Sequence, residues 1–469
     1  MKDWVRKQLS SPQHTIREVI RTISNAQIGV SVIVNEQDKL LGYVTDSDIR
    51  RAILNNVSLD TPVSEIMVKK PFTVPVGLSS EEVLVLMKKN RVNRAPVVDL
   101  DGVVQDIVIS WRLQEEVKPQ PAAPALDFSI PSKRDSKKGK KVLVIGAGGY
   151  VGSVVCRELL QEGYEVRGLD RFLFGDESLQ EIIHHEHFEL VRGDIRNLDV
   201  LVDATFGVDA VINLAAIVGD PACDLDVNHT IMINYFSAKA AADAARHYKV
   251  DRYLFASTAA VYGASSGKDR LTETAAVAPV SLYAESKLHS EKGILSLATD
   301  DFSPCIFRLG TVFGLSPRMR FDLVVNLFAM QAYFNKKITV FGGTQYRPYV
   351  HVRDIARALI AALKAEKSKI HGQIFNLGAN KMNLRLVDLA DQVAAAMPGT
   401  QVIRQEQASD QRDYNVSFDK IRERLGFESD WDIPAAIREI REAFERGEFK
   451  DFQDKKYSNV KQQEHLIFG

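Results

Sequence analysis

Short apolar runs alternate with helical patterns in the chain from residue 140 onward. The run Val142–Ile145 is followed by "SVVCRELLQEG", whose apolar residues recur every three or four positions, as on one face of a helix. A second strand pattern, "YEVRGLD", comes next and ends at Asp170. Strands that alternate with helices in this way predict an α/β domain built on a parallel sheet.

The preceding part of the chain contains a weak internal repeat with an offset of 64 residues, which sets Ser31 against Ala95. "SVIVNEQDKLLGYVTDSDIRRAI" and "APVVDLDGVVQDIVISWRL" each show an apolar strand, an acidic turn, a second strand and the start of a helix. A helical pattern precedes each copy, in "TIREVIRTISNA" and "SSEEVLVLMKKN". The repeat predicts an α+β module of two similar halves within residues 1–115.

Between these two parts, residues 114–141 contain four prolines and then a basic polar run. Such a segment buries little apolar surface and is typical of a linker. We therefore expect a module over 1–115, a linker over 116–139 and an enzyme-sized domain over 140–450. A smaller lobe should form mainly after residue 310, and residues 451–469 should be a polar tail.

Composition supports a globular protein of two or three domains: the chain has 469 residues, of which 45% are hydrophobic and 26% charged. A formal net charge of −1 gives no reason to expect nucleic acid or an anionic membrane as partner. No apolar run approaches the roughly 18 residues of a membrane span, and the first residues lack the apolar stretch of a secretory signal. The three cysteines lie far apart and predict neither disulfides nor a metal site, so we expect a cytoplasmic protein without a metal: Cys156, Cys223 and Cys305.

The strongest local motif is "KVLVIGAGGYVG", in which Gly146, Gly149 and Gly152 follow a strand at three-residue steps and lead into a helix. Glycines there permit a tight turn and close approach of the backbone to a pyrophosphate, which the helix N-terminus also attracts. The acid Asp170 follows Gly152 by eighteen residues, where it would accept hydrogen bonds from ribose hydroxyls and repel a 2′-phosphate. The motif therefore predicts NAD as cofactor, with Arg171 as the one residue that favours NADP.

Beyond this motif the chain resembles the extended short-chain dehydrogenase/reductases, the sugar-nucleotide epimerases and dehydratases. The resemblance covers residues 140 to about 446 and includes "RGDIRN", "VINLAA", "MINYFSA", "FASTAAVYG" and "SLYAESK". It implies a Rossmann-like doubly wound parallel sheet with a small C-terminal substrate lobe, and a homodimer or homotetramer. The cofactor-binding residues that it implies are Gly146, Gly149, Tyr150, Val151, Gly152, Asp170, Arg171, Asp194, Ile195, Leu214, Ala215, Ala216, Tyr283 and Lys287.

The same resemblance implies Thr258, Tyr283 and Lys287 as catalytic residues. The pKa of a free tyrosine is about 10. A tyrosine that acts as a base at neutral pH therefore needs positive charge nearby. A lysine one helical turn away and the charge of oxidised nicotinamide would supply it. Tyr283 would then take a proton from a sugar hydroxyl, with Thr258 orienting the substrate oxygen.

The two residues after Thr258 reduce the number of reactions that the chain could catalyse. The 4,6-dehydratases of the family carry an Asp-Glu pair directly after the threonine, whereas this chain has Ala259 and Ala260. Alanine transfers no proton, so we expect oxidation of a sugar 4-hydroxyl that ends in 4-epimerisation or in release of a 4-keto product. The alternatives are a 4-ketoreductase and a non-catalytic regulator that binds nucleotides and NAD(H).

Later motifs resemble the family's substrate-binding segments and imply a nucleotide-sugar. They place Asn326 in the substrate loop and two arginines, Arg347 and Arg412, at the diphosphate, where guanidinium groups bind through paired hydrogen bonds. The stretch "GLSPRMRFDLVVN" is similar to GDP-heptose 4-dehydrogenases, while other members of this subgroup are UDP-glucose 4-epimerase-like. Both UDP- and GDP-sugars therefore stay open.

The N-terminal repeat resembles a tandem CBS-domain pair. Its most specific element, "GYVTDSDI", implies that Thr45 and Asp48 bind the ribose and phosphates of an adenine nucleotide. The second copy has Asp106, Ile109 and Arg112 at the corresponding positions, so we expect at most one such site. The alternative is that Thr45 and Asp48 only cap the helix that follows.

Overall fold

The computed structural model describes residues 3–26, 30–45, 48–49, 52, 57–90, 92, 94–109, 140–264, 270–406, 413–449, 451–452 and 454–468. Contacts within the chain divide it into two compact units, Met1–Arg134 and Asp135–Gly469, which are described separately. The expected linker, 116–139, lies outside the described residues.

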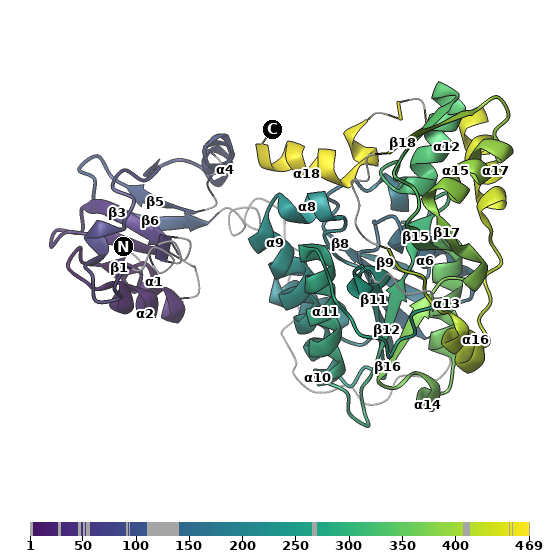
Figure 1. Cartoon of the computed structure of the whole chain (residues 1–469). Coiled ribbons are helices and arrows are strands. Elements are labelled where there is room, and N and C mark those ends of the chain that lie inside the picture. Colours follow the sequence, from purple (N-terminus) through teal and green to yellow (C-terminus); the bar gives the residue numbers. More distant parts are fainter. Residues whose placement is uncertain are drawn as a thin grey trace. The chain divides into compact units, whose positions relative to one another are not determined.

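The N-terminal unit contains two sheets of the same design (Figure 1). In each, the first strand pairs in parallel with the second, and the second pairs antiparallel with the third. The first sheet has β1 (Leu9–Ser10), β2 (Val30–Val34) and β3 (Leu40–Thr45), and the second has β4 (Val74–Pro75), β5 (Arg94–Val98) and β6 (Val104–Ile109). The helical segments are α1 (Asp3–Arg6), α2 (Ile16–Ala26), η1 (Val63–Glu65) and α4 (Ser80–Lys89).

The two copies of the predicted internal repeat share an irregularity in strand pairing. The register of β2 against β3 shifts between Ile33 and Val34, and that of β5 against β6 shifts between Val97 and Val98. These two bulges are related by the same 64-residue offset that relates Ser31 to Ala95 in the sequence. Because a bulge is a specific local feature of a strand pair, the two halves are structural copies of one another.

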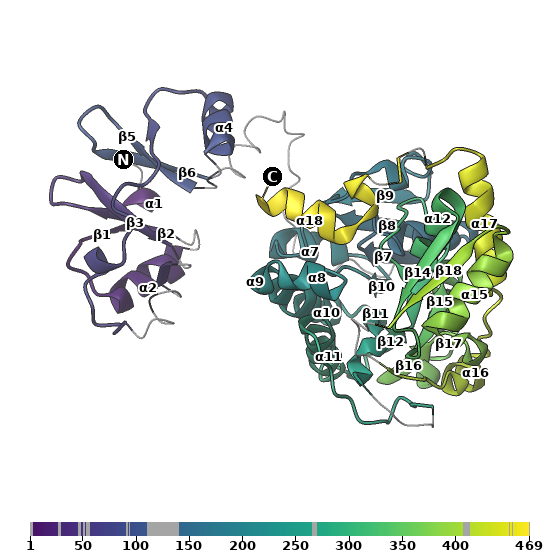
Figure 2. The same ribbon diagram turned by 45° about the horizontal axis from the view of Figure 1, so that its top comes forward.

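The second unit is built on a seven-stranded parallel sheet, in the order β16-β12-β11-β10-β7-β8-β9. Helices cover both faces (Figures 1 and 2), and each face has its own apolar core, so the predicted doubly wound Rossmann-like fold is confirmed. The chain reverses direction across the sheet between β7 and β10, the place where such folds bind ligands. The strands are β7 (Lys141–Ile145), β8 (Glu165–Asp170), β9 (Phe188–Arg192), β10 (Ala210–Asn213), β11 (Arg252–Thr258), β12 (Ser303–Leu309) and β16 (Gln373–Leu377).

The helices of this unit begin with α6, which follows the glycine motif after β7. Up to β12 they are α6 (Gly152–Gln161), η2 (Glu177–Leu179), α7 (Leu198–Thr205), α8 (Asp220–Asp224), α9 (Val227–Ile231), the π-helical η3 (Met232–Ser237), α10 (Ala238–His247), η4 (Ala259–Tyr262) and α11 (Leu282–Leu295). After β12 they are α12 (Val324–Asn335), α13 (Val352–Lys364), α14 (Lys367–Ile370), η5 (Asn380–Met382), α15 (Leu386–Ala396), α16 (Asp419–Leu425), α17 (Ile433–Glu445), η6 (Lys455–Tyr457) and α18 (Asn459–Phe468).

A smaller lobe gathers beyond the carboxyl ends of the strands (Figure 2). It has one sheet of β13 (Thr311–Phe313), β15 (Tyr346–His351) and β17 (Asn383–Arg385), and a second of β14 (Lys337–Phe341) and β18 (Gln401–Gln405). Helices α12, α15 and α17 pack together beside these strands. The apolar core of the lobe is continuous with the core on one face of the large sheet, so the lobe is fixed to it.

The C-terminal segment differs from the polar tail that its sequence predicts. η6 and α18 fold back onto the second unit, where α18 contacts α8, and the backbone amide of Phe321 donates to the carbonyl of Tyr457 at 3.0 Å. Among the described residues, no helix is both long and apolar enough to cross a membrane. Cys156, Cys223 and Cys305 are all buried free thiols.

Candidate active site

Two cavities adjoin at the carboxyl ends of the central strands. The larger, of about 590 Å³, extends from the glycine turn through Thr258 and Tyr283 to Arg347 in the smaller lobe. The second, of about 170 Å³, lies over the ends of β8 and β10. Both are lined by Gly146, Gly149, Phe174, Leu214, Ala216, Val218 and Asn459, so they form one continuous groove.

The glycine turn between β7 and α6 has the geometry that a dinucleotide requires. Gly146 has φ +87°, a left-handed conformation that side chains rarely adopt. A Cβ on Gly152 would lie 2.0 Å from the carbonyl oxygen of Gly146, so any side chain there would break the turn. Tyr150 and Val151 line the larger cavity beside the glycines. The turn therefore leaves the backbone room to approach a pyrophosphate.

The smaller cavity brings together the residues expected at the adenosine end. Asp170 accepts hydrogen bonds from the amides of Gly148 at 2.9 Å and Phe172 at 2.7 Å. Burial raises the pKa of Asp170, and these amides lower it. Arg171 forms an ion pair with Asp194 at 3.4 Å, so its charge is already compensated. The expected residues that line this cavity are Gly146, Gly149, Asp170, Arg171, Asp194, Ile195, Leu214, Ala215 and Ala216.

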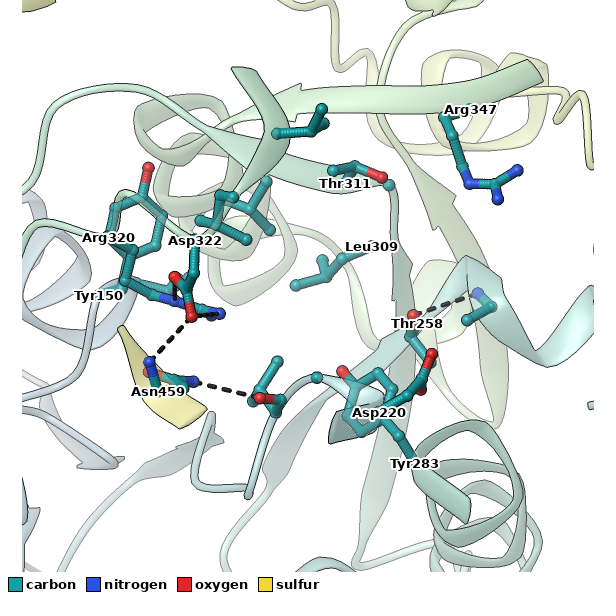
Figure 3. A pocket seen from close by; sticks show the side chains of 18 of the residues that line it. Tyr150, Asp220, Thr258, Tyr283, Leu309, Thr311, Arg320, Asp322, Arg347 and Asn459 are labelled. Atoms are coloured by element: carbon teal, nitrogen blue, oxygen red, sulfur yellow. Dashed lines mark hydrogen bonds and ion pairs between the residues drawn. The ribbon is translucent and has the colours of Figure 1, made fainter. Parts of the chain in front are cut away.

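The three expected catalytic residues meet at the larger cavity, which all of them line. Thr258 ends β11, and Tyr283 and Lys287 lie one turn apart on α11. The Ser281 hydroxyl caps this helix by accepting from the amide of Ala284 at 3.3 Å. Figure 3 shows Thr258 and Tyr283 close together in the cavity, and the Thr258 side chain lowers the pKa of the Tyr283 phenol.

The charges around Tyr283 differ in part from the expected arrangement. Burial raises the pKa of the Tyr283 phenol, while the Thr258 side chain and the positive charge of Arg320 lower it. Arg320 is thus a cation of the protein that favours ionisation of the phenol. Lys287 is 2% exposed and its Nζ lies 4.1 Å from the centre of the Phe255 ring. Burial lowers the pKa of Lys287 to about 7.

A buried polar cluster behind α11 was not predicted from the sequence. Glu291, one turn after Lys287, accepts a hydrogen bond from Ser257 Oγ at 2.5 Å and forms a two-point ion pair with Arg308 at 2.7 Å. Arg308 also donates to Tyr262 Oη at 3.1 Å. The cluster ties α11 to β11 and β12, and so holds Tyr283 and Lys287 in position against Thr258. The one local feature of the sequence that indicates this cluster is the glutamate one helical turn after Lys287.

The acid–base groups in the cavity are sparse. Ala259 is buried and Ala260 lines the cavity, and neither side chain can transfer a proton. Among the described residues that line the larger cavity, the carboxylates are Asp220 and Asp322. Asp322 is held in a two-point ion pair by Arg320, at 2.8 and 3.0 Å. Asp220 lies on the catalytic side, near Tyr283 (Figure 3).

Of the expected substrate residues, Arg347 lines the larger cavity on its side nearest the small lobe (Figure 3). Its Nη1 donates to the carbonyl of Tyr346 at 2.8 Å, and its guanidinium lies 5.0 Å from the centre of the Tyr414 ring. Arg412 lies outside the described residues.

Asn326 does not occupy the position that direct substrate contact requires. It is fully buried, and its Nδ2 donates to Tyr150 Oη at 3.0 Å and to the carbonyl of Arg320 at 2.9 Å. Its Oδ1 accepts from the amide of Gly314 at 3.1 Å. Because these bonds occupy the amide group, Asn326 positions the loop over residues 314–320 in place of the substrate contact we expected.

In the N-terminal unit, Thr45 and Asp48 bond to each other. Asp48 Oδ2 accepts from the amide of Thr45 at 3.0 Å and from its hydroxyl at 2.6 Å, and the amide of Asp48 donates back to Thr45 Oγ1 at 3.4 Å. This reciprocal pattern is that of a helix cap. No group of three metal-binding side chains occurs among the described residues.

Comparison with known proteins agrees with this geometry. Residues 142–378 match the NAD dependent epimerase/dehydratase family, and residues 11–55 and 63–114 match the CBS domain. An uncharacterized UDP-glucose epimerase of Bacillus subtilis is 29% identical over 267 residues, which are 54% of this chain and 82% of that protein. A UDP-glucose 4-epimerase of Corynebacterium glutamicum is 29% identical over 255 residues, 51% of this chain and 75% of that protein.

Solved structures give the same result. The UDP-glucuronic acid 4-epimerase of Bacillus cereus, in complex with UDP-glucuronic acid and NAD, is 25% identical and superposes with a TM-score of 0.57 over 65% of this chain and 99% of that chain. Over half of the chain is thus accounted for by one family, and the glycine turn and the adenosine cavity fit its cofactor. The chain belongs to the NAD dependent epimerase/dehydratase family, and it is an NAD-dependent enzyme that also carries a CBS-domain pair.

Proposed function

We propose that the enzyme oxidises the 4-hydroxyl of a UDP- or GDP-sugar to a 4-keto sugar, and that the product is a 4-epimer or the ketone itself. The observation that supports this most strongly is the Thr258–Tyr283 pair within one groove that joins the cofactor cavity to Arg347. A substrate that reaches from Arg347 to Tyr283 would present its sugar at the hydroxyl-bearing residues.

Each catalytic residue has a defined part in this reaction. Thr258 orients the substrate hydroxyl, and Tyr283 accepts its proton at the phenol oxygen. Lys287 lies one helical turn after Tyr283 and is buried. The hydroxyl groups of a bound ligand would take the place of water around its ammonium group and so raise its pKa. NAD, when bound, accepts a hydride and supplies the redox chemistry.

The groups that follow the oxidation favour epimerisation or release of the ketone. Ala259 and Ala260 offer no acid or base for elimination of water. Asp220 is near Tyr283 and is a hydrogen-bond acceptor for sugar hydroxyls. Its negative charge disfavours a substrate with a carboxylate at the same end of the cavity.

The nucleotide-sugar substrate is supported by the relatives and by Arg347. The relatives are named for UDP-glucose, and a neighbour in structure binds UDP-glucuronic acid. Arg347 faces the groove as a diphosphate ligand would require. We expect Arg412 to join it, as the sequence predicts.

Incubation of the purified enzyme with UDP- and GDP-sugars tests the proposal. Formation of a 4-epimer without net accumulation of reduced nicotinamide would identify an epimerase. A lasting rise in its absorbance together with a keto sugar would identify a 4-dehydrogenase. A chain that binds these ligands, yet gives no product with any of them, would contradict the proposal and support a non-catalytic regulator.

We also propose that the CBS pair binds an adenine nucleotide through Thr45 and Asp48. Their mutual hydrogen bonds hold the hydroxyl and carboxylate together, as a ribose site would need. Titration with AMP, ADP and ATP should show binding that Thr45→Val reduces without loss of NAD binding. Equal nucleotide binding by this variant would leave these residues as a helix cap only.

A homodimer is supported by exposed apolar side chains on one helical segment. Met232 and Phe236 of η3 are 42% and 53% exposed, and apolar side chains that are exposed close together can form an interface with another subunit. Light scattering should give twice the monomer mass or a higher multiple, and Phe236→Glu should shift it toward the monomer. A monomeric parent protein would contradict this.

A further inference from the structure

Arg318 is a buried cation that the catalytic proposal does not use. It is 7% exposed, and its guanidinium carbon lies 3.7 Å from the centre of the Phe174 ring. Its Nη2 donates to Asn459 Oδ1 at 2.8 Å, and within the described part of the chain its Nε has no hydrogen-bond partner. A guanidinium out of water without a full set of partners is costly, so the site is suited to an anion.

The neighbouring carboxylate compensates this charge only in part, because its hydrogen bonds go to other residues. Asp322 is held by Arg320 in the two-point ion pair and also accepts from the amide of Asn459 at 2.9 Å. Burial and the charge of Arg320 together lower the pKa of Arg318 to about 9, although the charge of Asp322 acts in the opposite direction. Arg318 therefore has a neutral amide and an aromatic ring beside it, where an ion pair would be expected.

The position of Arg318 indicates which anion it meets. Arg318 lines the larger cavity, and its two neighbours, Phe174 and Asn459, line both cavities together with Gly146 and Gly149. In Figure 3, Asn459 lies on the side of the cavity near Tyr150, the residue that follows Gly149. Arg347 lies across the cavity from it, on the same side as Thr258. The cation is thus near the glycine turn and far from the expected site of the substrate diphosphate.

Hydrogen bonds to two neighbouring loops hold Asn459, at the start of α18, where its side chain contacts Arg318. Its amide donates to Asp322 Oδ2, and its Nδ2 donates to the carbonyl of Val218 at 3.2 Å. Three residues later, Gln462 Nε2 donates to the carbonyl of Leu173 at 3.2 Å. The start of α18 therefore bridges the loops after β8 and β10 and the loop before α12.

We propose that Arg318 binds the pyrophosphate of NAD, and that Asn459, a positioning residue, holds the guanidinium in place for it. The C-terminal segment, residues 454–468, is then part of the cofactor site and closes it over the pyrophosphate. Release of NAD requires this segment to separate from the loops that it bridges. Such retention suits an enzyme that returns the hydride to its substrate within one turnover.

Calorimetric binding to the NAD-free full-length protein tests this without any assay of turnover, so it can fail independently of the proposed reaction. Arg318→Ala should weaken NAD about 10- to 100-fold, the loss typical of hydrogen bonds to a charged group. Binding of adenosine, which has no phosphate, should be unchanged. Asn459→Ala should weaken NAD less, and Arg318→Lys should restore part of the affinity.

The controls separate the two possible sources of a diphosphate. Lys461→Ala removes an exposed positive charge from the same helix and should leave NAD binding unchanged. Arg347→Ala should weaken UDP and leave NAD unchanged, the reverse of Arg318→Ala. Loss of UDP but not NAD binding in Arg318→Ala would overturn the proposal, as would equal losses for NAD and adenosine, which indicate a purely structural role. Unchanged NAD binding would overturn it as well.

Discussion

The carboxylate of Asp220 lies beside the phenol of Tyr283 in the catalytic cavity. Burial raises the pKa of Tyr283, and the negative charge of Asp220 raises it further. This placement opposes the ionisation that a base requires, and the positive charge of bound oxidised nicotinamide would offset it in part. Arg320 supplies positive charge from the protein itself.

Removal of the Asp220 charge should therefore shift the pH dependence of turnover. Asp220→Asn lowers the pKa of Tyr283, so the limb of kcat that rises with pH should move to lower pH by about half a unit or more. The measurement is the midpoint of that limb, whatever the absolute rate. Asp224→Asn, an exposed change in the same helix, should leave the midpoint in place. A midpoint that moves to higher pH would show that Asp220 does not act on the phenol.

Lys287 should make the NAD-free enzyme sensitive to pH. Its pKa falls from 10.5 to about 7 on burial, so the folded state binds fewer protons than the unfolded state between these values. The free energy of unfolding should therefore rise with pH across this window. Lys287→Met should be more stable than the parent at pH 7, by at most about 5 kcal/mol, and the difference should vanish above about pH 10.5. Urea unfolding of both proteins at several pH values checks this. If the unfolding free energies of the two proteins changed with pH in the same way, the prediction would be refuted.

The Glu291–Arg308 pair should be important for stability because both side chains are buried. Glu291→Gln leaves the Arg308 charge uncompensated and should cost about 3–5 kcal/mol of unfolding free energy. Arg308→Met in the same chain should recover part of this loss, since it removes the buried charge as well. Urea unfolding of the two single variants and the double variant gives the coupling energy. Additive losses would mean that the pair contributes little.

Cofactor preference should depend on Asp170. Its carboxylate lines the adenosine cavity, whereas the nearby Arg171 is occupied by Asp194. The enzyme should bind NAD more tightly than NADP, and Asp170→Asn, which keeps the shape of the side chain, should reduce that preference about 10-fold or more. Asp199→Asn, an exposed change in α7, serves as the control. An unchanged ratio of the two dissociation constants would assign the preference to another residue.

Local features of the fold could be predicted from the sequence. The turn at Gly146 and Gly152, the acid Asp170 and the one-turn spacing of Tyr283 and Lys287 each depend on residues that are close in the chain. Their roles follow from backbone geometry and helix periodicity, so the structure brings them to the expected places. The 64-residue repeat was equally visible, since both copies keep the same order of elements.

Features made by distant segments could not be predicted. Arg318 and Asn459 are separated by 141 residues in the sequence, and no periodicity links them. Asn326 was expected at the substrate because of its place in a motif, yet the motif does not reveal that Tyr150 Oη and two backbone groups bind its amide. The helical fold of residues 455–468 was missed because its polar composition is that of a tail, while its contacts are made by a few buried side chains.

The central claim is that Tyr283 transfers the proton of the sugar hydroxyl. Single-turnover reaction of the Tyr283→Phe variant with the accepted nucleotide-sugar tests it most directly, with binding of NAD and substrate measured on the same protein. The account predicts ligand binding within a few-fold of the parent enzyme and a rate lower by about 10²- to 10⁴-fold. A variant that binds both ligands and forms product at the parent rate would contradict it.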